Sequence, residues 1–175
     1  MSENQAQEKT GVSPIEVHGV EKRVIGDRVI IRQGVVQSLE ANEVTIRQGA
    51  TLISKAANIS VSNSSVAISH SQEASFSSSK SGIAIVNGNA NFDQSGAKVL
   101  LVNGYASLDQ SGNILLAAKE VQGTNINTVF FFGKNVHGNV QTAFGAKESI
   151  LFGLIAGFVS GTFLVLYKLF FGKKQ

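Results

Sequence analysis

The sequence predicts an all-β protein, a single-stranded parallel β-solenoid of about eight coils of 15–16 residues, followed by one transmembrane α-helix. Three observations predict this architecture: short motifs recur at a fixed period, apolar residues keep one phase through the repeats, and an uncharged apolar segment lies near the C-terminus. We expect residues 1–14 to form a disordered tail, 15–145 the solenoid, 149–171 the transmembrane helix and 172–175 a basic tail.

The repeat is visible in two pairs of motifs. VIIRQG at 29–34 returns as VTIRQG at 44–49, and FDQSG at 92–96 returns as LDQSG at 108–112, so the period is 15 or 16 residues. An extended chain of this length measures about 50 Å, which is enough for two or three short strands and their corners. Coils that stack through parallel strand ladders satisfy the backbone groups of such a chain.

Apolar residues form columns one repeat apart. We expect one column to line the interior as a single file, which comprises Ile31, Ile46, Val61, Phe76, Phe92 and Leu108. A second column lies two residues earlier in each repeat and comprises Val29, Val44, Ile59, Ala74, Ala90 and Ala106. A third lies seven residues after the first, is also expected in the core, and comprises Ile53, Ile68, Ile83, Val99, Leu115 and Phe131. Because the columns continue through the serine-rich residues 60–81, this stretch is predicted to be solenoid rather than linker.

The triplets RQG, SNS, SSS and DQS that follow the strands are candidate turns. Their middle residues form either an amide ladder along the axis or a merely soluble corner, and comprise Gln33, Gln48, Asn63, Ser78, Gln94 and Gln110. The preceding column is basic in the early coils, at Arg32 and Arg47, and acidic in the late coils, at Asp93 and Asp109. This gradient predicts an assembly edge where neighbouring molecules meet, and the alternative is a set of solvated charges that contribute little.

Residues 149–167, SILFGLIAGFVSGTFLVLY, are nineteen consecutive uncharged positions. As a helix, this segment is long enough to cross about 30 Å of hydrocarbon. Gly153, Gly157 and Gly161 lie four residues apart and predict a helix–helix contact, unless they reflect the ordinary abundance of glycine in membrane helices. The N-terminus has no apolar core of a secretory signal, so we expect a single-pass inner-membrane protein with its solenoid on the cytoplasmic side.

The most aromatic run lies just before this segment. Phe130 and Phe132 are expected to point outward by strand alternation, while Phe131 points to the core. The two outward rings predict a contact with the bilayer or with a neighbouring molecule.

Composition argues against catalysis and against nucleic-acid binding. The chain has no cysteine, three widely spaced histidines and no glycine-rich nucleotide motif, so we expect no enzyme, cofactor or metal site. Residues 1–148 hold twelve acidic and twelve basic residues, and a neutral body lacks the charge that nucleic acid requires. Asp93 and Asp109 suit the carboxylate spacing of a glycosidase, but the turn offers no tryptophan on which a sugar would stack.

The opening VIGDRVIIRQG at 24–34 and the short repeats of alternating aliphatic residues resemble the bactofilins, which are bacterial polymer-forming β-helical cytoskeletal proteins. The resemblance covers residues 20–142. It implies nucleotide-free polymerisation through stacked coil ends, association with membranes and recruitment of cell-envelope enzymes. The chain departs from that family in its serine-rich middle coils and in its C-terminal anchor, which should obstruct stacking at that end.

The sequence therefore predicts a non-catalytic, membrane-anchored β-solenoid that acts as a scaffold or assembly module. Its expected partners are the lipid bilayer and either further copies of the chain or other membrane proteins. Two alternatives stay open. One is an accessory subunit of a larger membrane complex, held by the glycine face of its helix, and the other is a glycan-binding or polysaccharide-active β-helix.

Overall fold

The computed structural model describes residues 14–144, together with 154, 155, 157, 158 and 160–162. Seven strands fill the first of these ranges: β1 (Ile15–Arg47), β2 (Ala50–Ser62), β3 (Ser65–Ser77), β4 (Lys80–Val86), β5 (Ala90–Asp93), β6 (Gly96–Asp109) and β7 (Gly112–Phe144). Several strands bend around corners without a break in pairing, so that one strand follows most of a turn.

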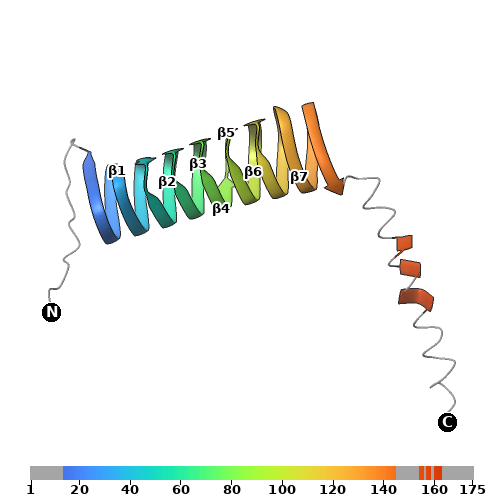
Figure 1. The fold of residues 1–175 in the computed structure, drawn as a ribbon, viewed down its shortest axis with the longest axis horizontal. Helices are drawn as coiled ribbons and strands as arrows, with labels where there is room; N and C mark the ends of the chain where they lie inside the picture. The colour runs from blue at the N-terminus through green and yellow to red at the C-terminus, as the bar shows by residue number, and fades with distance from the viewer. Residues whose placement is uncertain (1–13, 145–153, 156, 159, 163–175) are drawn as a thin grey trace, which may run out of the picture. The chain divides into compact units, whose positions relative to one another are not determined.

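Each strand pairs in parallel with residues one turn away. Ile59 pairs with Ala74, fifteen residues later, and Ala74 pairs with Ala90, sixteen residues later. The chain is therefore a parallel β-solenoid, seen from the side in Figure 1, and its middle turns include the serine-rich stretch. The sequence predicted about eight coils, whereas these registers join about six turns. β1 and β7, of 33 residues each, extend beyond these registers at the two ends.

The predicted interior file is confirmed. Its six side chains are 0–1% exposed, and consecutive members from Ile46 to Leu108 are register partners. The second column is also buried along its whole length. The side-chain sizes in the two columns compensate for each other. One turn combines Ile59 with Val61, and the next two turns combine a small residue with a large one, Ala74 with Phe76 and Ala90 with Phe92. The two phenylalanine rings stack with centroids 4.5 Å apart and an interplanar angle of 13°.

The prediction that the third column lies in the core is wrong for five of its six members. Ile53, Ile68 and Ile83 are 51%, 41% and 38% exposed, and Val99 and Leu115 are half-buried. The inward positions lie one residue later, and comprise Ser54, Ser69, Ala84, Leu100 and Leu116. The reason is a corner at which two consecutive residues face outward, which shifts the alternation by one. Phe131 alone packs, half-buried, against the core.

A second corner is built from residues in the left-handed backbone region. Non-glycine residues with φ of 46–55° recur once a turn, and comprise Gln33, Gln48, Asn63, Ser78, Gln94, Gln110 and Asn125. The predicted turn triplets are therefore confirmed. Long and β-branched side chains rarely adopt this conformation, so its recurrence shows that the stacked turns hold the corner in place. The amide ladder is present between Gln33 and Gln48, where the Nε2 of Gln33 donates to Oε1 of Gln48 at 3.4 Å.

Buried serines support this corner from inside. The Ser79 hydroxyl donates to the Ser77 carbonyl at 2.7 Å and accepts from the Ser64 N–H at 3.2 Å. The Ser95 hydroxyl makes the same two bonds one turn later. It donates to the carbonyl of Asp93, which is the register partner of Ser77, and accepts from the Ser79 N–H. These hydroxyls satisfy buried amides that the bent backbone leaves without strand partners. The serine content of the middle turns therefore has a structural use.

We expect Ser79→Ala to lower the free energy of unfolding by about 1–3 kcal/mol, because it leaves the buried Ser64 N–H without its acceptor. Ser69→Ala is the matched control. The Ser69 hydroxyl is equally buried but has no hydrogen-bond partner among the described residues, so its removal should be neutral or stabilising. Urea unfolding of both variants, followed by far-UV circular dichroism, measures the difference. Equal losses in both would contradict the assigned role.

The C-terminal part is described at only a few positions. These residues, between 154 and 162, are helical. No helix among the described residues is both long enough and apolar enough to cross a membrane. Most of the predicted transmembrane helix, including Gly153, lies outside the described residues, as do residues 1–13 and the basic tail.

Candidate functional site

The residues of the predicted assembly edge stack in one column from Arg47 to Asp109. Register pairs link Arg47 to Ser62, Ser77 to Asp93, and Asp93 to Asp109. The four charged residues Arg32, Arg47, Asp93 and Asp109 are exposed, and none forms an ion pair with another described residue. The edge therefore carries positive charge on the early turns and negative charge on the late turns, and its charges are available to an outside partner.

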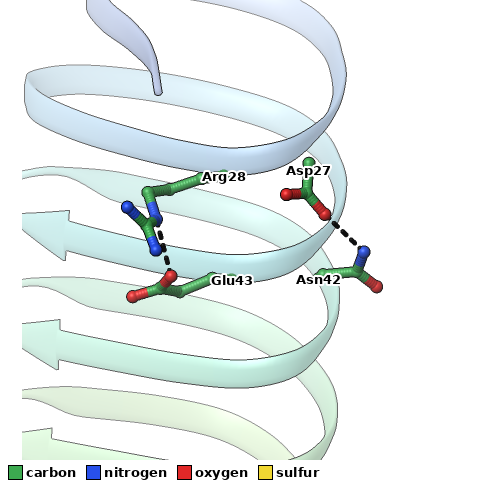
Figure 2. A network of polar contacts seen from close by, with 4 residues as sticks. All are labelled: Asp27, Arg28, Asn42 and Glu43. Carbon is green, nitrogen blue, oxygen red and sulfur yellow. Dashed lines mark hydrogen bonds and ion pairs between the residues drawn. The ribbon is translucent and has the colours of Figure 1, made fainter. Parts of the chain in front are cut away.

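Some of the other charged residues on the early turns form contacts within the solenoid. In the two contacts drawn in Figure 2, the Arg28 Nε donates to Glu43 Oε2 and the Asn42 Nδ2 donates to Asp27 Oδ1. The donor–acceptor distances are 2.6 Å and 2.5 Å, respectively. Each contact joins residues fifteen apart, one turn to the next. These pairs hold neighbouring turns together, and exposed pairs of this kind contribute at most about 1 kcal/mol. They are internal contacts of the solenoid, in contrast to the charged edge.

If the charged edge mediates self-association, reversing Asp93 and Asp109 to lysine should weaken that association several-fold, because like charges then face each other at the contact. Sedimentation velocity of the detergent-solubilised full chain measures this. The control variant Glu21→Lys with Glu73→Lys makes the same change in net charge at positions off the edge. Unchanged association of the first variant would remove the assembly role of the edge.

A polar groove with a volume of about 530 Å³ runs along the solenoid from β1 to β6. Glu43, Asn58 and Glu73 line it together with Tyr105, whose hydroxyl donates to Gln122 Oε1 at 2.5 Å. Glu43 is engaged by Arg28, and Asp93 and Asp109 do not line this groove. The two aspartates of the glycosidase hypothesis are thus in register but lie on the exposed edge rather than in this groove.

An apolar groove of about 560 Å³ lies across the late turns, and the sequence did not predict it. Ile85, Leu101 and Ala117 are register partners on three successive turns, and Phe132 from the next turn completes the apolar lining. Asn87, Asn103, Lys119 and Lys134 form one side of the groove. The late repeats contain two consecutive apolar residues, such as Leu100 and Leu101, and only one of the two can point inward. The outward member of each pair is the sequence signal that could have predicted this groove.

The outward direction predicted for Phe130 and Phe132 is confirmed, since they are 41% and 61% exposed. Phe132 lines the apolar groove, which the sequence did not anticipate. Gly157 and Gly161 lie on described helical residues, exposed, and an added Cβ at either would meet no atom within 4 Å. The structure leaves room for close approach of a second helix at these two glycines, and the contact itself stays a prediction.

Among the described residues, no group of three or more histidine or carboxylate side chains is placed to hold a metal ion. Comparison of the chain with protein-family models, with curated proteins and with solved structures finds no match.

Proposed function

We propose that the protein is a non-catalytic scaffold, anchored by its C-terminal apolar segment at the inner membrane, whose solenoid assembles with further copies or recruits other membrane proteins. The observation that carries this proposal is the joining of a regular solenoid to the nineteen-residue uncharged segment 149–167. A solenoid repeats the same surface at each turn, which suits extended contacts, and the apolar segment meets the length requirement for spanning.

Self-association is supported by the form of the solenoid. The terminal turn of any parallel solenoid presents strand edges that other chains pair with unless something covers them. The resemblance to bactofilins favours the same behaviour, with stacking expected at the N-terminal end because the anchor follows the last turn. The charged edge offers a lateral contact in addition. We therefore expect short assemblies at the membrane rather than free filaments.

Flotation of the full chain with liposomes, followed by alkaline carbonate extraction, tests the anchor. We expect the chain to stay with the lipid after extraction, and release by carbonate would contradict the proposed spanning segment. Electron microscopy and sedimentation in detergent test assembly. Homopolymers support the scaffold, whereas a strictly monomeric chain supports the alternative of an accessory subunit of a larger membrane complex.

The polar groove supports the second alternative, a glycan-binding β-helix, because its lining of amides, hydroxyls, carboxylates and one tyrosine suits hydrogen bonding to sugars. A glycan array with the purified chain tests it. Binding that is lost in Tyr105→Ala and kept in Phe132→Ala would favour this alternative.

A further inference from the structure

One outward column of the solenoid changes character halfway along the molecule. On the early turns the column consists of Glu40, Lys55 and His70, and on the later turns it continues as Ile85, Leu101 and Ala117. Lys55 Nζ lies 3.3 Å from Glu40 Oε1, so these two charges on the early part of the column pair with each other. The later part has apolar side chains open to the surface, with Leu101 37% exposed.

The apolar stretch is broad because a second apolar column runs beside it. Ile83, Val99 and Leu115 are register partners at the neighbouring corner and are exposed or half-buried. Together the two columns and Phe132 form a surface that we call the apolar face. Contiguous apolar surface of this kind on a folded domain marks a site of contact.

The charged residues that line the groove in the apolar face are both lysines. Lys119 and Lys134 line the groove on one side, and Lys98 directly precedes Val99 on the other. No carboxylate lines the groove. The nearest acid in sequence, Glu120, lies beyond Lys119 with its Oε1 3.9 Å from His137 Nε2. The late-turn aspartates, Asp93 and Asp109, are on the charged edge instead.

We propose that the apolar face rests on the surface of an anionic lipid bilayer, with the late turns of the solenoid lying along the membrane. Apolar side chains flanked by lysines match such a surface, because the side chains enter the acyl boundary while the lysine stems extend to anionic headgroups. This inference rests on the proposed function only in placing the chain at a membrane.

A second copy of the chain matches the apolar face less well. Two such faces in a two-fold contact would bring the lysines of one copy against those of the other, and like charges at an interface oppose binding. The charged edge of another copy would supply carboxylates, but its neighbouring column of Ser75, Asn91 and Ser107 is polar and would leave Leu101 and Phe132 without apolar partners.

The chain contains no cysteine, so a single introduced cysteine carries a unique fluorescent label. We would label Leu101→Cys on the apolar face, with Phe132→Cys as a second site, and Ser75→Cys in the polar groove as the matched control. The full chain is reconstituted in vesicles that contain phosphatidylglycerol, and the label is quenched either by lipids with brominated acyl chains or by aqueous iodide. We expect the brominated lipids to quench the labels at 101 and 132, and iodide to quench the label at 75.

Charge dependence gives a second readout. Lys119→Gln with Lys134→Gln should lower the ratio of membrane-facing to solvent-facing label at 101 by about five-fold for each lysine. Lys22→Gln with Lys80→Gln removes the same charge outside the groove and should leave the ratio unchanged. Vesicles of phosphatidylcholine alone should reproduce the effect of the first pair of substitutions.

Quenching at 101 by iodide alone would overturn the inference, and so would protection from both quenchers, which would mean that protein covers the face. Carbonate extraction on the same samples reports the anchor independently. A chain that resists carbonate while its label at 101 faces water refutes the apolar-face contact and leaves the proposed anchor standing. A chain that carbonate releases, but whose label is quenched by brominated lipid, refutes the anchor and supports the contact.

Discussion

Phe92→Ala is expected to lower the free energy of unfolding by about 3–5 kcal/mol, the usual cost of removing a buried aromatic ring. Phe92 is fully buried, and its ring stacks on Phe76 in the turn before. The loss is large because Phe92 is one of the largest fully buried side chains and the neighbouring Ala90 contributes little volume. The substitution therefore opens a cavity that the stacked backbone cannot close. Urea unfolding of the detergent-solubilised chain, followed by far-UV circular dichroism, measures the change in midpoint.

Phe132→Ala is the matched control, since it removes the same ring from a side chain that is 61% exposed. We expect a change of at most about 0.5 kcal/mol from this surface substitution. If the two variants unfold at the same urea concentration, the interior file does not hold the solenoid together.

Ala90→Ile is expected to destabilise the protein by about 1–3 kcal/mol through overpacking. Ala90 is 2% exposed, lies in register between Ala74 and Ala106, and points inward beside Phe92, two residues later on the same strand. Additional methylene groups at this position meet Phe92 in a space already filled. The same unfolding measurement detects the loss.

A compensating change makes this prediction specific. The double variant Ala90→Ile with Phe92→Val reproduces the Ile59–Val61 pair that the protein already uses. We expect it to be more stable than the sum of the two single losses predicts, because the total volume inside the turn is restored. Additive losses would show that the two columns do not share one space.

Parts of the candidate site were readable from the sequence. The edge formed by Arg32, Arg47, Asp93 and Asp109 followed from the period alone, since residues one turn apart in a solenoid must stack. The outward direction of Phe132 followed from alternation within a strand. The apolar groove was not predicted, because its lining residues belong to pairs of consecutive apolar residues. The sequence does not indicate which residue of each pair points inward.

The sequence by itself determined the period, the parallel stacking and the identity of the interior file, because each of these depends only on which residues recur at 15 or 16 positions. The tertiary structure alone decided where each turn bends. At the corner occupied by Ile53, Ile68 and Ile83, two successive residues face outward, and all later positions on that face change sides. Alternation is a local property of a straight strand, whereas a corner is fixed by the packing of the turns above and below it. An aliphatic column that the pattern placed inside thus lies on the surface, beside the groove of Leu101 and Phe132.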